Sequence, residues 1–233
     1  ETQGGVVDID ITGPGTRIDG SGEFTVDGTF NILAGIAGAR SRFATVEDGT
    51  DTFGGTINVD IIAGGLLDIS GGTRFGSSIF SASAAANHGR TTGADSFGGT
   101  VNFNIDGAGS TLVADGFSGL ALHGRGNSTS TFRGSSTGGS GTGGAVNLTV
   151  NGGTITANRL ELDAGASGSS NASNNTNESL NSAFSGNVTA SFTGTTLSIN
   201  ELTLLTEARA ARSFDAMGNL VTGNAAGGDL AVT

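Results

Sequence analysis

Residues 98–105 read Gly-Gly-Thr-Val-Asn-Phe-Asn-Ile, and residues 143–150 read Gly-Gly-Ala-Val-Asn-Leu-Thr-Val. In both stretches a glycine pair precedes a run in which apolar and polar side chains alternate. Alternation with a period of two places the apolar side chains on one face of a β-strand and the polar ones on the other. Each stretch therefore predicts a half-buried strand that begins just after a glycine pair.

The same pattern recurs along the whole chain of 233 residues. The glycine pair, once replaced by Ser-Gly, begins at residues 4, 54, 98, 143, 185 and 227. Successive copies are 42 to 50 residues apart, and self-similarity at such a period is typical of repeat architectures. The predicted repeats are 4–53, 54–97, 98–142, 143–184 and 185–226, with the start of a sixth at 227–233. Because the last copy stops within its first strand, we expect the chain to be a segment of a longer array.

Each repeat contains further strand signals after the first one. A glycine-rich turn such as residues 151–153 leads to a second short strand such as 154–157. A third strand is clear at residues 120–122, 160–162 and 202–205. Stretches such as 127–142 and 167–182 are rich in Ser, Thr, Asn and Gly and predict polar loops that bulge from one face.

One such repeat has no place to bury its apolar face, but stacked repeats do. Strands that pair in parallel with their equivalents, about 4.8 Å apart, would form ladders of identical positions. The inward ladder would consist of Val7, Ile57, Val101, Val146 and Val188. The predicted fold is all-β, a parallel β-solenoid (β-helix) of about five turns. An antiparallel β-sandwich is the alternative, although it does not require similar strands at a fixed period.

Composition excludes several classes of protein and site. There are 43 glycines and one proline, and no cysteine, so disulfides and thiolate sites are excluded. All ten basic residues are arginines, and the net charge is −11. Such a chain repels phosphate backbones and anionic membrane surfaces, so we expect no nucleic-acid partner. No apolar run approaches the length of a membrane-spanning helix, so we also expect no direct membrane insertion.

Polar side chains form a second predicted ladder, on the outward face of the first strands. Its members include Asp8, Asn58, Asn102, Asn147 and Thr189. Stacked amides that bond along the array are the preferred interpretation, and Ca²⁺ binding is the alternative because carboxylate oxygens suit that ion. The weak candidates for Ca²⁺ are Asp8, Asp10, Asp60, Glu47, Asp48 and Asp51. We otherwise expect no cofactor.

The sequence offers no recognisable catalytic motif, and we expect no enzymatic activity. A polysaccharide lyase or hydrolase would need paired carboxyl groups, for which the candidates are Asp68 and Asp115 with Arg74 or Arg125. The two histidines, His88 and His123, have no partner at metal-ligand spacing. We expect both to be surface or loop residues.

The units at 98–105 and 143–150 resemble the repeats of large bacterial surface β-solenoids, which include autotransporter passenger domains and filamentous-haemagglutinin-like exoproteins. The resemblance covers the whole chain, and it implies export through the outer membrane and an adhesive or structural role at the cell surface. We therefore expect a non-enzymatic module, with a subunit of a self-assembling filament or surface layer as the alternative. The expected partners are further repeats, copies of the same chain through open ends, and surface glycans or other cell-surface proteins.

Overall fold

The computed structural model describes residues 2–19, 31–33, 36–37, 51–70, 78–87, 94–116, 119–129, 139–168, 182–210, 212–214, 220–222 and 224–233. Within these residues the regular structure consists of strands, and every sheet but one is parallel. The predicted all-β, parallel class is therefore confirmed. None of the described residues lies in a helix long and apolar enough to cross a membrane.

The strands form four parallel sheets, which we number 1 to 4. Sheet 1 contains, in spatial order, β1 (Thr2–Gln3), β6 (Thr52–Phe53), β11 (Ser96–Phe97), β16 (Gly141–Thr142), β20 (Ala183–Phe184) and β26 (Ala225–Ala226). Sheet 2 contains β2 (Val6–Thr12), β7 (Thr56–Ile62), β12 (Thr100–Asp106), β17 (Ala145–Asn151), β21 (Asn187–Thr193) and β27 (Leu230–Val232). In both sheets the spatial order of the strands follows their order in the sequence.

Sheet 3 is the widest. The first half of the long strand β18 (Thr154–Asp163) pairs with β13 (Thr111–Ala114), which is followed by β8 (Leu66–Asp68) and β3 (Arg17–Asp19). The second half pairs along the same edge with β14 (Leu120–His123), which is followed by β9 (Ser78–Ser81) and β4 (Asn31–Leu33). Strand β22 (Thr196–Leu205) pairs with β18 along nearly its whole length. Strands β18 and β22 thus each span the length that β13 and β14 span together.

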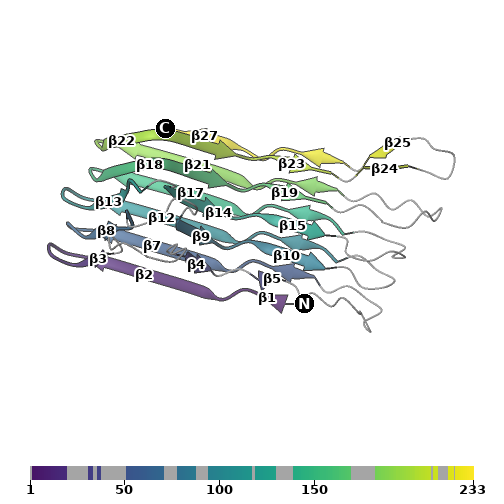
Figure 1. Ribbon diagram of the computed structural model, residues 1–233, viewed down its shortest axis with the longest axis horizontal. Coiled ribbons are helices and arrows are strands. Elements are labelled where there is room, and N and C mark those ends of the chain that lie inside the picture. Colours follow the sequence, from purple (N-terminus) through teal and green to yellow (C-terminus); the bar gives the residue numbers. More distant parts are fainter. Residues whose placement is uncertain are drawn as a thin grey trace.

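Sheet 4 contains β5 (Ile36–Ala37), β10 (Ala84–Asn87), β15 (Gly126–Thr129), β19 (Ala166–Ser167) and β23 (Ala208–Arg209). A separate antiparallel pair joins β24 (Arg212–Phe214) to β25 (Leu220–Thr222). Figure 1 shows the strands in layers, from the purple N-terminal strands to the yellow C-terminal ones.

Strand β15 differs from the sequence prediction, which assigned residues 127–142 to a loop. Its residues pair in register with Ala84–Asn87 on one side and with Ala166 and Ser167 on the other. These are small or polar side chains, so backbone hydrogen bonds rather than an apolar face define the strand. Such a segment lacks the alternation of apolar and polar residues that predicts a half-buried strand.

The inward ladder lies in register in sheet 2. Val7 pairs with Ile57, Ile57 with Val101, Val101 with Val146, and Val146 with Val188. The last four of these side chains are fully buried. Sheet 3 supplies the opposite wall of the core, because Phe80 of β9 meets Phe103 of β12 edge to face, with ring centroids 5.5 Å apart. Sheets 2 and 3 therefore enclose one apolar core.

The glycine pairs mark the points where opposite sides of the fold come together. The backbone nitrogen of Gly144 donates to the carbonyl oxygen of Gly124 at 2.7 Å, and that of Gly99 donates to Ala82 at 2.8 Å. A Cβ atom on Gly144 would lie 1.8 Å from the carbonyl oxygen of Gly99, a distance that no real side chain shows. Glycine is thus required at this position by close backbone approach.

Candidate functional site

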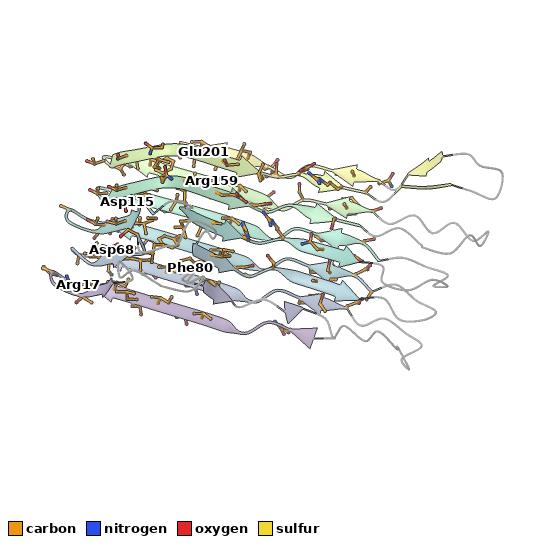
Figure 2. All side chains as sticks on the ribbon, in the orientation of Figure 1. Arg17, Asp68, Phe80, Asp115, Arg159 and Glu201 are labelled. Atoms are coloured by element: carbon orange, nitrogen blue, oxygen red, sulfur yellow. The ribbon has the colours of Figure 1, made fainter. Side chains whose placement is uncertain are left out.

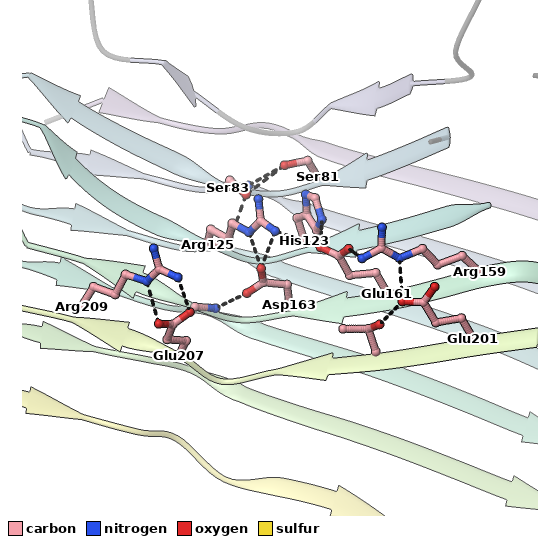
Figure 3. Close-up of polar contacts among 12 residues, drawn as sticks. Ser81, Ser83, His123, Arg125, Arg159, Glu161, Asp163, Glu201, Glu207 and Arg209 are labelled. Atoms are coloured by element: carbon pink, nitrogen blue, oxygen red, sulfur yellow. Dashed lines mark hydrogen bonds and ion pairs between the residues drawn. The ribbon is translucent and has the colours of Figure 1, made fainter. Parts of the chain in front are cut away.

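Charged side chains gather on the outward face of sheet 3, where β18 lies between β14 and β22 (Figure 3). Alternation along β18 buries Leu160 and Leu162 completely and turns Glu161 to the other face. Register then brings residues from the neighbouring repeat alongside, because Ala121 pairs with Glu161 and His123 with Asp163. The strand pairing thus assembles a cluster from residues that are far apart in sequence.

Glu161 is the centre of this cluster and contacts three basic side chains. Its Oε1 atom lies 3.1 Å from His123 Nε2 and accepts a hydrogen bond of 3.0 Å from Arg125. Its Oε2 atom lies 3.0 Å from a terminal guanidinium nitrogen of Arg159. The hydrogen bond from His123 lowers the pKa of Glu161, as do the charges of His123 and the two arginines, whereas burial opposes the shift. The net shift is downward, so this half-buried carboxyl is held in its ionised form.

Asp163 is the most buried charged group in the cluster, with its side chain 8% exposed. Its Oδ1 atom accepts a hydrogen bond of 2.7 Å from the backbone nitrogen of Gly165, and its Oδ2 atom accepts bonds from Arg125. A buried carboxylate is tolerated only when it is paired and hydrogen-bonded. Arg125 meets that requirement and also links Asp163 to Glu161.

Two further ion pairs lie beside the cluster, one between β18 and β22 and one at β23. Arg159 lies 3.5 Å from Glu201, and Arg209 donates two hydrogen bonds to Glu207, at 2.7 and 2.8 Å. The hydrogen bond from Arg209 lowers the pKa of Glu207, and the same bond raises the pKa of Arg209. A hollow of about 360 Å³ lies beside these residues and is lined in part by Arg125, Asp163, Glu207 and Arg209.

His123, Glu161 and Asp163 are the group that could hold a metal ion among the residues that the structure describes. One ligand atom from each lies within 4.8 Å of the others. The chemistry available at this site is therefore of two kinds. As drawn in Figure 3, it is a network of ion pairs that joins neighbouring strands. With Arg125 moved away, it offers one nitrogen and carboxylate oxygens to a cation.

The predicted outward ladder consists of polar side chains that are hydrogen-bonded from strand to strand across sheet 2. Asn147 donates to Asn102 at 2.9 Å, Asn102 donates to Asn58 at 2.8 Å, and Asn58 donates to Asp8 at 2.7 Å. Each amide donates to the side chain on the preceding strand, and the last acceptor of the row is the carboxylate of Asp8. This arrangement agrees with the interpretation of stacked amides.

Among the calcium candidates that the structure describes, Asp8, Asp10 and Asp60 lie together on sheet 2, whereas Asp51 lies apart from them. Asp10 pairs in register with Asp60, and Asp60 accepts a hydrogen bond of 2.9 Å from Asn104. Both line a surface hollow of about 310 Å³ together with Asp8. Asp51 accepts a 2.9 Å hydrogen bond from the backbone of Asp95. Glu47 and Asp48 lie outside the described residues.

The residues considered for sugar cleavage have separate surroundings. Asp68 accepts two hydrogen bonds from Ser70, one from its backbone nitrogen and one from its hydroxyl. Asp115 is exposed just after β13, and Arg125 pairs with Glu161 and Asp163 rather than with either aspartate. Figure 2 shows Asp68, at the end of β8, and Asp115, just after the neighbouring strand β13. Arg74 lies outside the described residues.

His123 is not a loop residue. It is the last residue of strand β14, on the outward face of sheet 3, and its side chain is 13% exposed and in contact with Glu161. A signal was present, since 120–122 and 160–162 were recognised as equivalent strands. Extending that equivalence by one residue places His123 beside Asp163. His88 lies outside the described residues.

The lowered pKa of Glu161 predicts that the cluster weakens in acid. A carboxyl whose pKa is lower in the folded than in the unfolded chain stabilises the fold above its unfolded value, here about 4.5. That contribution disappears as the pH falls through the lower, folded value. We expect wild type to be more stable than Glu161→Gln at about pH 6 and the difference to shrink by about pH 3. Urea unfolding in the presence of EDTA measures this, and a difference that stays constant over the range contradicts it.

No protein-family description, curated protein or solved structure matches this chain.

Proposed function

We propose that this chain is a parallel β-solenoid that serves as a non-enzymatic structural and adhesive module of a secreted or cell-surface protein, in the manner of the bacterial surface proteins whose repeats it resembles. Its mechanism is mechanical. Ladders of hydrogen bonds and apolar contacts stiffen a rod, and the outward polar surfaces and polar segments make contact with partners.

The observation that carries the proposal is the in-register pairing of equivalent residues from one repeat to the next. In sheet 2 this pairing runs from Val7 to Val188 without a change of register. Sheets 1 and 4 order their strands in the same direction along the chain. A coil of stacked repeats accounts for all of these pairings at once.

A structural role is supported by how the outward polar groups are used. The amides of Asn58, Asn102 and Asn147 bond to one another across repeats, as described above. Asp163, the most buried carboxylate among the residues that the structure describes, is paired with Arg125. These groups connect neighbouring repeats, which is the function expected of side chains in a rod.

Two assays test this proposal: one measures binding to cell-surface glycans or proteins, and the other looks for cleavage of acidic polysaccharides. We expect labelled protein to bind immobilised cell-surface glycans or proteins saturably, and to release no new reducing or unsaturated ends from an acidic-glycan panel. Turnover that is abolished in Asp68→Asn or Asp115→Asn, with the fold intact by circular dichroism, would contradict the proposal and favour a lyase or hydrolase.

A self-assembling filament or surface layer is a second candidate, and exposed apolar side chains on edge strands favour it. Val6 of β2 is 67% exposed, and Leu230 and Val232 of β27 are 51% and 53% exposed. Strands β2 and β27 lie at opposite edges of sheet 2, and unpaired edges can recruit strands of another copy. Electron microscopy separates the two candidates, because filaments support assembly and monodisperse short rods exclude it.

A further inference from the structure

The donor atoms of His123, Glu161 and Asp163 converge on one point of sheet 3. They lie within 4.8 Å of one another, and all three side chains are at most 15% exposed. Ligands around a tetrahedral ion with bonds of about 2 Å lie roughly 3.3 Å apart. Small rotations of these side chains would therefore be sufficient to coordinate one ion.

The guanidinium group of Arg125 occupies the place between these donors. Its terminal nitrogen Nη2 contacts Glu161 Oε1 at 3.0 Å and also contacts Asp163 Oδ2. The same Oε1 atom lies 3.1 Å from His123 Nε2. A positive group thus sits where the two carboxylates and the imidazole meet. The side chain of Arg125 is 34% exposed and borders the 360 Å³ hollow, so it has space into which to withdraw.

The charges of the connected cluster do not cancel when His123 is neutral. Glu161, Asp163 and Glu201 contribute three negative charges, whereas Arg125 and Arg159 contribute two positive ones. A divalent ion in the place of one guanidinium would make the cluster neutral. Arg159 could remain, because it pairs with the other oxygen of Glu161 and with Glu201.

We propose that His123, Glu161 and Asp163 bind a divalent transition-metal ion, for which Zn²⁺ is the best match, and that Arg125 is the counter-ion that this metal displaces. An imidazole nitrogen with carboxylate oxygens suits Zn²⁺, whereas Ca²⁺ and Mg²⁺ prefer sites built from oxygen alone. The bound ion would join β14 to β18, and so would link neighbouring repeats.

Calorimetric titration with Zn²⁺ tests the proposal, with Mg²⁺ as a parallel titrant. Arg125→Gln removes the competing cation, so Zn²⁺ no longer has to break the ion pairs of Arg125 with Glu161 and Asp163. Because the coupling energy of such close charge pairs corresponds to tenfold or more in affinity, the variant should bind Zn²⁺ at least about tenfold more tightly than wild type. Arg17→Gln is the matched control, because Arg17 lies on β3, at the far edge of sheet 3 from β14 and β18. It should leave the affinity unchanged. Adding His123→Ala to Arg125→Gln should abolish binding.

A spectroscopic measurement covers the case in which the double variant does not fold. The chain has two histidines, so His88→Ala together with Arg125→Gln leaves His123 as the single histidine. Its ring signals in nuclear magnetic resonance should shift on addition of Zn²⁺ and not on addition of Mg²⁺. The proposal is overturned if Arg125→Gln binds no Zn²⁺ or binds it no more tightly than wild type. It is also overturned if binding survives the loss of His123 or leaves its ring signals unchanged.

Discussion

Replacing Gly144 by alanine should lower the free energy of unfolding by at least about 3 kcal/mol, the upper range for forcing extra atoms into a packed site. The added Cβ would lie 1.8 Å from the carbonyl oxygen of Gly99 and 2.6 Å from two further atoms of Gly98. All three are backbone atoms, which cannot rotate away as the end of a side chain can. Relief therefore requires the strands of two repeats to separate. Urea unfolding followed by circular dichroism measures the effect.

Gly5→Ala is the matched control for this change. Gly5 belongs to the first glycine pair, yet a Cβ atom there would meet nothing within 4 Å, and its backbone conformation is open to any residue. We expect its free energy of unfolding to change by no more than about 0.5 kcal/mol. If the two substitutions change the free energy of unfolding equally, the strands do not approach each other closely at Gly144.

Phe103→Ala should lower the free energy of unfolding by about 3–5 kcal/mol, as expected for removal of a large core side chain. Phe103 is 1% exposed and meets Phe80 edge to face between sheets 2 and 3. The substitution leaves a cavity where the two sheets face each other, because the surrounding strands are fixed by their ladders.

Phe184→Ala provides the comparison, since Phe184 is 43% exposed. Its loss should cost much less than that of Phe103, by a difference of about 2 kcal/mol or more. Guanidinium or urea unfolding of the two variants measures this difference. Equal effects would mean that Phe103 does not lie in the core.

The parallel class and the register of sheet 2 could be predicted because their signals are local and repeated. Val101, Asn102 and Phe103 alternate in a way that assigns each residue to a face. The recurrence of the pattern then indicates which strand is its neighbour. The amide row through Asn58 and Asn102 follows from the same alignment.

No comparable sequence pattern predicts the backbone contacts that the glycine pairs make with other segments. The bond from Gly144 to Gly124 depends on where two segments approach in space, and nothing in their alternation indicates that approach. Strand β15 was missed because its small and polar residues resemble those of a loop. Backbone hydrogen bonds define such a strand, and they are almost independent of side-chain identity.

The charged cluster was missed for a different reason. Arg125 and Asp163 belong to successive repeats and are 38 residues apart, fewer than the 42 to 50 that separate the glycine pairs. An alignment of the sequence at the spacing of the glycine pairs therefore does not place Arg125 and Asp163 side by side. Aligning each strand separately, beginning with Leu120 and Leu160, brings His123 and Asp163 together.

Parallel, in-register stacking of the strands of sheet 2 can be tested by distances between spin labels. The chain contains no cysteine, so pairs of introduced cysteines can be labelled cleanly at outward positions of sheet 2. For stacked strands about 4.8 Å apart, Asp8→Cys with Asn147→Cys and Asn58→Cys with Thr189→Cys should both give about 14 Å between backbones. Asp8→Cys with Thr189→Cys should give about 19 Å. Two equal distances and one longer by a single strand spacing are the predicted result, and unequal distances for the first two pairs would contradict the account.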